Sequence, residues 1–324
     1  MAEERIPLIE TVDLKKYFKV GDKSFLHAVD GINMKVYAGE TIGVVGESGC
    51  GKSTLGRTIL RLIEPTSGQI LYNGDDITKY NTRQMKKMRQ ELQIIFQDPY
   101  ASLDPRKSVI EIIAEYMIIN KTLPKKREIF NRAAHLMDVV GLARRYATAY
   151  PHELDGGRRQ RIGIARALSV NPKFIVCDEP VSALDVSIQA QILNLLMDLQ
   201  DDMGLTYMFV THDLSVVKYI SDDILVMYLG TMVEKAPAEE LFANPMHPYT
   251  KALLSAIPEP DIHKKSRRII LQGEITSPID PKPGCRFMTR CQYASGECGE
   301  VQELEEVAPN HFVRCCKCRS LCEM

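Results

Sequence analysis

Short apolar runs and alternating segments dominate the first hundred residues and predict strands. Leu8 to Val12 alternates with polar residues like an edge strand, and Ile32 to Val36 continues this pattern after a polar turn at residues 21–24. Thr41 to Val45 is almost entirely apolar, which is typical of a strand buried on both faces. Further strands are predicted at 69–72 and 92–96, with a charged helix at 83–90 between them. The order predicts a small antiparallel sheet ahead of a parallel core.

Helical spacing of apolar residues follows this region. It runs from Val109 to Ile119 and again from Arg127 to Val140, and no strand pattern interrupts it. Residues from about 98 to about 168 therefore read as a helical insertion in an α/β core. Strand patterns return at 174–177 and 207–210, separated by a predicted helix at about 187–202.

Composition places the chain among globular proteins. It has 324 residues, of which 45% are hydrophobic and 26% charged, and this length suggests about two domains. The formal net charge of -1 provides no overall basic field of the kind that marks a nucleic-acid binder. The first residues lack the basic and apolar regions of a secretion signal, and no apolar run approaches the ~18 residues of a membrane span. We therefore expect a cytosolic protein.

A glycine-rich stretch lies where the buried strand at 41–45 meets the next helical segment. It has the pattern G-x-x-x-x-G-K-S and consists of Gly46, Glu47, Ser48, Gly49, Cys50, Gly51, Lys52, Ser53 and Thr54. The glycines let successive backbone N–H groups surround an anion at a helix N-terminus. Lys52 would reach the β- and γ-phosphates of a nucleotide, and the Ser53 hydroxyl would ligate Mg²⁺. The strand-and-helix setting favours a phosphate loop over a simple glycine-rich turn.

Polar groups end two of the later strands. Asp178 and Glu179 follow the apolar run from Phe174 to Cys177, at the strand edge where α/β sheets place ligands. Asp178 would hold Mg²⁺ through water, and Glu179 would orient or deprotonate an attacking water. His212 follows the strand at 207–210, which favours a contact with the γ-phosphate over an ordinary loop position.

Together these motifs resemble the nucleotide-binding subunit of an ATP-binding cassette (ABC) transporter over essentially the whole chain. The resemblance implies that Gly46 to Thr54 is the Walker A loop, that Asp178 is the Walker B aspartate and that Glu179 is the catalytic glutamate. Gln97 resembles the Q-loop glutamine, and the resemblance implies that it ligates Mg²⁺ together with Ser53 and Asp178. Residues 182–185 resemble the D-loop. His212 resembles the switch histidine. Phe18 would stack on adenine, with Tyr17 as the alternative.

The signature motif departs from the family pattern Leu-Ser-Gly-Gly-Gln. The corresponding residues are Leu154, Asp155, Gly156, Gly157 and Arg158. In family dimers this motif closes on the γ-phosphate held by the partner's Walker A loop, so Asp155 offers a carboxylate where an anion should bind. Asp155 can still cap the following helix, and Arg158 partly offsets its charge. We hypothesise that this signature is weakened and that a different partner supplies a serine-containing one. The alternative is that the substitution is tolerated or was introduced artificially.

Seven of the nine cysteines lie beyond residue 284. In a reducing compartment this favours metal or redox chemistry over disulfides. Cys50 and Cys177 read instead as small residues of the loop and strand. The run from Asn244 to Leu254 resembles the C-terminal element of dipeptide, oligopeptide and nickel importers, some of which carry a [4Fe–4S] cluster. The cysteines that match this branch are Cys285, Cys291, Cys298 and Cys315, and zinc is the alternative metal. The roles of Cys316, Cys318 and Cys322 stay open.

The sequence thus predicts an α/β P-loop NTPase with a RecA-like core, an antiparallel β-subdomain, a helical subdomain and a cysteine-rich C-terminal extension. The predicted domains are 1–243 and 244–324. The resemblance implies an ATPase that drives peptide uptake at the cytoplasmic face of the membrane, paired with a second nucleotide-binding subunit. Two permease subunits and, indirectly, an extracytoplasmic substrate-binding protein complete the set, without nucleic acid. The alternatives are a soluble ABC ATPase of translation or DNA repair and a non-catalytic nucleotide-binding scaffold.

Overall fold

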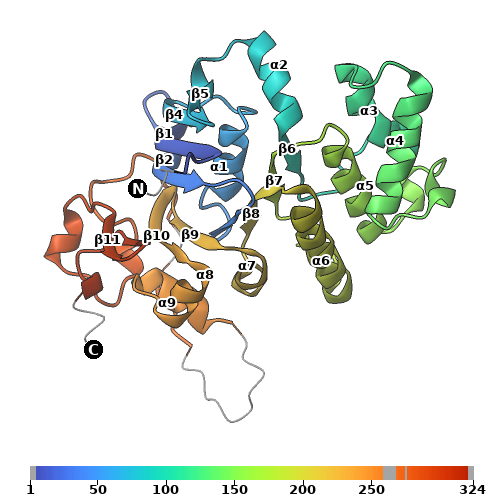
Figure 1. The fold of residues 1–324 in the computed structure, drawn as a ribbon. Helices are drawn as coiled ribbons and strands as arrows, with labels where there is room; N and C mark the ends of the chain where they lie inside the picture. The colour runs from blue at the N-terminus through green and yellow to red at the C-terminus, as the bar shows by residue number, and fades with distance from the viewer. Residues whose placement is uncertain (1–4, 258–267, 274–275, 320–324) are drawn as a thin grey trace. The chain divides into compact units, whose positions relative to one another are not determined.

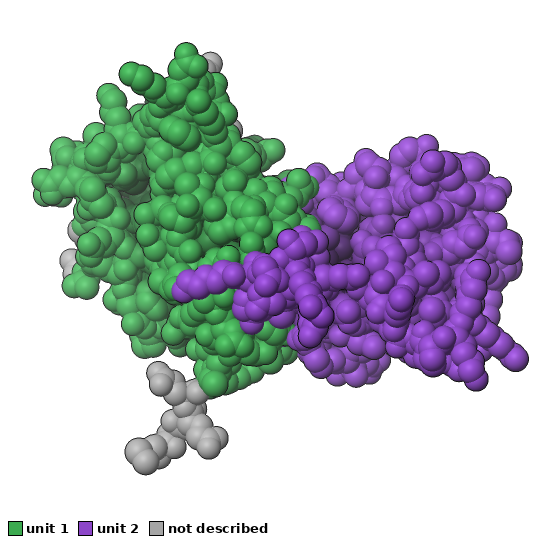
Figure 2. All heavy atoms as spheres, turned by 90° about the horizontal axis from the view of Figure 1, so that it is seen from above, with its two compact units in different colours: residues 1–78, 209–324 green, residues 79–208 purple. Residues whose placement is uncertain are grey.

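The computed structural model describes residues 5–257, 268–273 and 276–319 (Figure 1). The chain forms two compact units, which are coloured separately in Figure 2. The first comprises residues 1–78 and 209–324, and the second comprises residues 79–208. Each is described by itself below. Among the described residues, no helix is long and apolar enough to cross a membrane.

An antiparallel sheet opens the first unit. Its strands are β1 (Ile9–Lys19), β2 (Phe25–Val36), β4 (Ser67–Tyr72) and β5 (Asp75–Asp76), in the order β2-β1-β4-β5. The predicted strands at the start of the chain are confirmed, and both are longer than the alternation alone indicated. The polar turn between them is closed by a hydrogen bond from the Val20 N–H to the Ser24 carbonyl, 3.0 Å long.

A second group of strands carries the phosphate loop. β3 (Thr41–Val45) is buried at every position and runs parallel to β9 (Asp223–Tyr228), as its apolar sequence predicts. β10 (Thr231–Pro237) lies antiparallel to β9, and the C-terminal strands β12 (His311–Val313) and β11 (Glu305–Ala308) continue this sheet beyond β10. The C-terminal extension is therefore part of the same sheet as the strand that precedes the loop (Figure 1).

The helices of the first unit are short. They are α1 (Lys52–Ile59), α7 (Leu214–Ile220), α8 (Ala238–Ala243) and α9 (Pro248–Ser255), with single 3₁₀ turns at Met288–Arg290 and Gly296–Gly299. The fully buried His247 caps α9, because its Nδ1 accepts the Tyr249 N–H at 3.1 Å. Burial lowers the pKa of His247 to about 4, so the ring is neutral at pH 7 and acts as the acceptor that this cap needs. Its role here is structural.

The second unit contains a parallel strand pair and a helical segment. β6 (Leu92–Ile95) pairs in parallel with β7 (Phe174–Asp178). Between them lie α3 (Val109–Asn120), α4 (Lys126–Val139), 3₁₀ turns at Arg144–Tyr146 and Pro151–Glu153, and α5 (Gly156–Leu168). The stretch from 96 to 173, all of it described, contains no strand, which confirms the predicted helical insertion. The proposed limits of the domains remain predictions.

The remaining elements lie before β6 and after β7 along the chain. α2 (Thr82–Glu91) follows a 3₁₀ turn at Ile77–Lys79, and α6 (Val186–Met203) precedes β8 (Thr206–Thr211), which leads the chain back to the first unit. Asn81 and Gln84 form a capping box that fixes the start of α2: each side chain accepts the backbone N–H of the other, at 3.0 and 2.9 Å.

Candidate nucleotide site

The phosphate loop occupies the turn from β3 into α1, and two of its glycines are required by close backbone approaches. A Cβ on Gly46 would lie 2.2 Å from the carbonyl oxygen of Met227. A Cβ on Gly51 would lie 1.9 Å from the carbonyl oxygen of Ala28, and Gly51 has a φ of 106°. The backbone of the loop thus packs closely against β2 and against the end of β9. These two contacts fix the path of the loop.

Lys52 lies at the first position of α1 and is only 4% exposed. Its Nζ donates to the carbonyl oxygens of Gly46 and Glu47, at 2.8 and 3.0 Å. The ammonium group is therefore directed across the loop, where phosphate oxygens can replace the two carbonyls as acceptors. Ser53 and Thr54 lie in the first turn of the same helix, so the predicted loop and its lysine are brought together as the motif requires.

The loop has partners that the sequence pattern did not indicate. The N–H of Glu47 donates to the Tyr249 hydroxyl at 2.9 Å. The Glu47 carboxylate accepts two hydrogen bonds from Arg290, at 2.7 and 3.1 Å. Both partners come from the C-terminal third of the chain, and no local pattern relates them to the loop.

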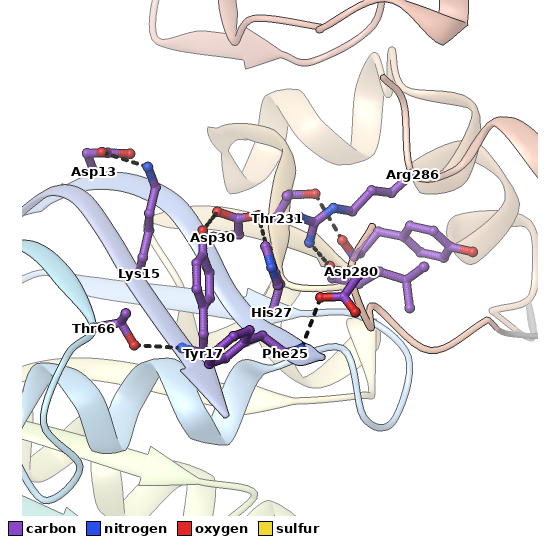
Figure 3. Close-up of polar contacts among 12 residues, drawn as sticks. Asp13, Lys15, Tyr17, Phe25, His27, Asp30, Thr66, Thr231, Asp280 and Arg286 are labelled. Atoms are coloured by element: carbon purple, nitrogen blue, oxygen red, sulfur yellow. Dashed lines mark hydrogen bonds and ion pairs between the residues drawn. The ribbon is translucent and has the colours of Figure 1, made fainter. Parts of the chain in front are cut away.

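Of the two aromatic candidates for adenine, Tyr17 is already engaged. Its ring stacks on His27 at a centroid distance of 3.8 Å, and its hydroxyl donates to Asp30 at 2.5 Å (Figure 3). Burial, together with the hydrogen bond to Asp30, raises the Tyr17 pKa far above its usual range. Phe18, the next residue of β1, points to the opposite face of the strand and is half-buried, with the Lys16 ammonium 4.9 Å from its ring centroid.

His212 follows β8 directly and is exposed to solvent. The next residue, Asp213, caps α7 by accepting the Ser215 N–H at 2.9 Å. His212 therefore lies between a buried strand end and a capped helix, which places it at the carboxyl end of a core strand as predicted.

In the second unit, the two acidic residues after β7 differ in environment. Asp178 is fully buried at the end of the strand. Glu179 is half-buried and has a φ of 48°, a left-handed conformation that is uncommon for a side chain of this size. The Gln97 side-chain amide donates to the Glu179 carboxylate at 2.8 Å. The structure thus brings together the predicted Q-loop glutamine and the predicted catalytic glutamate.

The altered signature caps α5. The Asp155 carboxylate accepts the Arg158 N–H at 2.8 Å, and the Arg158 guanidinium lies 2.5 Å from its other oxygen. A Cβ on Gly157 would lie 2.7 Å from a methyl carbon of Ile188, so this glycine permits the close packing of α5 on α6. The cap and the charge compensation expected from the sequence are both present. The carboxylate now occupies the helix end that binds an anion in the unaltered motif.

Five of the seven C-terminal cysteines line one small cavity. Its wall includes Cys285, Cys291, Cys298, Cys315 and Cys316. Burial raises the pKa of Cys285 and of Cys315 to about 11, so both are protonated thiols at neutral pH. Within the described ranges, no three Cys, His, Asp or Glu side chains are arranged as ligands of one metal ion. The predicted metal geometry is thus not found there, and Cys322 lies outside the described residues.

Comparison with known proteins agrees with these features. The model of the ABC transporter family matches residues 29–182, and the model of the oligopeptide/dipeptide transporter C-terminal region matches residues 233–298. A putative oligopeptide transport ATP-binding protein of Bacillus subtilis, YkfD, is 51% identical, with 96% of this chain and 95% of the relative covered. The oligopeptide transport ATP-binding protein OppF of Salmonella typhimurium is 48% identical, with 97% of both chains covered.

Solved structures show the same fold. A dimeric post-hydrolysis state of the ATP-binding cassette MJ0796, bound to ADP and Pi, has a TM-score of 0.65 and 28% identity, covering 71% of this chain and 98% of that one. CbiO1 of Clostridium perfringens has the same TM-score and 30% identity, covering 74% and 91%. The fold and site define a P-loop ATPase of the ABC class. The chain belongs to the ABC transporter family, in its branch of oligopeptide transport ATP-binding proteins.

Proposed function

We propose that this chain is the ATP-hydrolysing subunit of an importer for dipeptides or oligopeptides. The relatives named for oligopeptide transport, which align along almost the whole chain, support this substrate class. The observation that carries the catalytic part is the pairing of Gln97 with Glu179, because a scaffold that only binds nucleotide has no need of an oriented carboxylate.

Each polar group of the site has a part in hydrolysis on this proposal. Lys52 and the loop amides stabilise charge on the transferring phosphoryl group, and Glu179 orients the attacking water. His212 contacts the γ-phosphate. The donor set of one hydroxyl, one carboxylate and one amide oxygen suits Mg²⁺, which would be held by Ser53, Asp178 and Gln97 and would neutralise phosphate charge.

We assign adenine stacking to Phe18. Tyr17 supports this choice because one face of its ring is covered by His27 and its hydroxyl is bonded to Asp30. The half-buried Phe18 ring on the opposite face of β1 has the flat apolar surface that a base needs.

We further propose a heterodimer, in which this chain's weakened signature faces the ATP bound by a partner. Changing Asp155→Ser together with Arg158→Gln then restores a hydroxyl donor at the end of α5 and removes the carboxylate. The ATPase rate of the assembled complex is expected to rise at least about threefold, less than the ~100-fold effect of a whole oxyanion donor.

A matched control tests the same chemistry elsewhere. Arg144 and Asp138 form another exposed ion pair in the same unit, with 2.5 Å between charged atoms. Changing Asp138→Ser with Arg144→Gln should leave the ATPase rate unchanged. Equal rates for the wild type and the double signature variant would contradict the idea that the signature is impaired.

The remaining partners are two permease subunits, with which the chain would associate at the cytoplasmic face of the membrane, and indirectly a substrate-binding protein. Purifying the intact complex through this chain and identifying its other components tests this set. The proposal expects two permeases and a second cassette with a serine-containing signature. Recovery of ribosomes or DNA-repair proteins instead would favour a soluble ABC ATPase.

We propose a sulfur-ligated metal centre at the cysteine cavity, with a [4Fe–4S] cluster preferred to zinc. The support is the chemistry of the donors: Cys285, Cys291, Cys298 and Cys315 all line one cavity. Anaerobically purified protein should contain about four iron atoms and show iron–sulfur absorption that a Cys298→Ser change weakens. Stoichiometric zinc without iron would identify the other metal, and the absence of both would rule out a resident centre.

A further inference from the structure

One C-terminal segment, from Cys285 to Cys291, reaches the phosphate loop directly. Arg290 Nη1 and Nη2 donate to the two carboxylate oxygens of Glu47, at 2.7 and 3.1 Å. The side chains are only 7% and 21% exposed, so water screens this pair weakly. Glu47 is the second residue of the phosphate loop, and the residue bound to it lies 243 positions further along the chain.

The same segment also contacts β2, the strand that pairs with β1. Arg286 pairs with Asp30 and donates to the Leu229 carbonyl at the turn between β9 and β10. Asp30 in turn accepts from the Tyr17 hydroxyl and lies 3.0 Å from His27 Nδ1 (Figure 3). A single short segment therefore has ionic contacts both to the phosphate loop and to β2 of the first unit.

Between the two arginines, Phe287 anchors the segment in the core. It is 1% exposed, and its ring packs edge-on against Tyr228 at 5.2 Å and at a tilt against Tyr249 at 5.4 Å between centroids. The Tyr249 hydroxyl is the group that accepts the N–H of Glu47. The segment and the loop thus both contact the aromatic cluster of Tyr228, Tyr249 and Phe287.

A cysteine stands at each end of this segment. Cys285 immediately precedes Arg286, and Cys291 immediately follows Arg290. Both line the cavity shared with Cys298 and Cys315. A change in the backbone position of Cys285 or Cys291 would therefore act directly on the residues next to them, which are the two arginines.

We propose that the Cys285–Cys291 segment is part of the nucleotide site, in which Arg290 positions the phosphate loop through Glu47 and so couples nucleotide binding to the cysteine cavity. The inference rests on the proposed ATP site. Arg290 touches no substrate on this account and is a positioning residue. Because coupling between two sites is reciprocal, binding of nucleotide at the loop should also alter the cavity wall, and the reactivity of its thiols reports that change.

The first experiment is a titration of Mg·ATP into the full-length protein and its variants, with thermal unfolding recorded for each. Arg290→Ala should raise the Kd at least about tenfold, because it leaves the Glu47 carboxylate half-buried and unpaired. Arg290→Lys should recover part of the loss, since lysine cannot form the two parallel bonds. Adding Glu47→Gln to Arg290→Ala should weaken binding no further than Arg290→Ala alone.

The control is Arg319→Ala, whose side chain is 78% exposed and lies at the end of the described chain. It should bind Mg·ATP like the wild type. If Arg290→Ala does not fold, Arg290→Lys and Glu47→Gln decide the question. A Kd within twofold of the wild type for these variants would overturn the positioning role. So would strictly additive effects of Arg290→Ala and Glu47→Gln on the binding free energy when the two changes are combined. Failure of the wild type itself to bind Mg·ATP would instead refute the proposed function.

The second experiment tests the reciprocal direction. The metal-free protein is treated with N-ethylmaleimide, and alkylation of each cysteine is followed by mass spectrometry with and without Mg·ATP. Nucleotide should slow alkylation of Cys285 and Cys291 several-fold in the wild type and have no such effect in Arg290→Ala. Rates that are the same with and without nucleotide in the wild type would contradict the coupling.

Discussion

The Glu179→Gln variant is expected to bind Mg·ATP as tightly as the wild type and to hydrolyse it at least about 100-fold more slowly, the usual scale of lost general base catalysis. The substitution keeps the size of the side chain and an oxygen that can accept the Gln97 amide at its present 2.8 Å. It removes only the negative charge and the basic oxygen. Binding and turnover should therefore separate cleanly.

The measurement compares ATP affinity with the steady-state ATPase rate of the assembled complex. Glu128→Gln, on α4 and with a side chain 43% exposed, is the matched control and should leave both unchanged. Full turnover in the Glu179 variant would show that another group activates the water, and our assignment of the catalytic carboxylate would then be wrong.

Lys52→Ala is expected to weaken ATP binding by about 10- to 150-fold, the equivalent of one charge-assisted hydrogen bond worth about 1.5–3 kcal/mol. The Lys52 ammonium is buried and donates within the phosphate loop, to the carbonyls of Gly46 and Glu47. Its removal takes a positive charge from the place where phosphate would bind. The loop path itself is fixed by the close backbone contacts of Gly46 and Gly51.

Equilibrium titration with Mg·ATP measures this effect, and thermal unfolding separates it from loss of fold. Lys23→Ala, in the exposed turn between β1 and β2, is the control and should bind normally. Unchanged ATP affinity in a folded Lys52 variant would mean that the loop does not hold the phosphates. The interpretation of residues 46–54 as a phosphate-binding loop would then be wrong.

Much of this account could be predicted from local sequence, for physical reasons. The apolar run at Thr41–Val45 leaves no solvated face, so only a buried strand suits it, and the glycines that follow permit the close approaches seen at Gly46 and Gly51. Asp155 could be expected to cap α5 because a short acceptor before a helical segment finds the N–H groups of the first turn. The burial of the strand and the cap of α5 depend on residues close in sequence, whereas the backbone atoms that the two glycines approach belong to β9 and β2.

The features that could not be predicted depend on contacts between residues that are distant in the sequence. The strands β11 and β12 are short and have no strong alternation, and they become strands because β10 offers an edge. Arg290 and Tyr249 form direct hydrogen bonds with Glu47 although they lie 243 and 202 positions away in the sequence. Nothing in the residues next to them in the sequence indicates a contact with the loop. Likewise the engagement of Tyr17 by His27 and Asp30 depends on the pairing of β1 with β2.

The cysteines illustrate an intermediate case. Their residue type and clustering in the sequence correctly indicated a common location, since Cys285, Cys291, Cys298 and Cys315 line the same cavity. Spacing alone does not fix the directions of the thiols, and the described part of the chain has no three-ligand arrangement. The common location of these cysteines could thus be expected from the sequence, and their role as metal donors stays a prediction.

ATP hydrolysis on this chain is proposed to drive peptide uptake. The most direct test of this proposal reconstitutes the chain with its cognate cassette, permeases and substrate-binding protein in lipid vesicles and measures accumulation of radiolabelled peptides of two to five residues. The account predicts accumulation that requires Mg·ATP and is lost when this subunit carries Glu179→Gln. Accumulation that persists undiminished in the Glu179 variant, or ATP hydrolysis without any uptake of peptide, would contradict it.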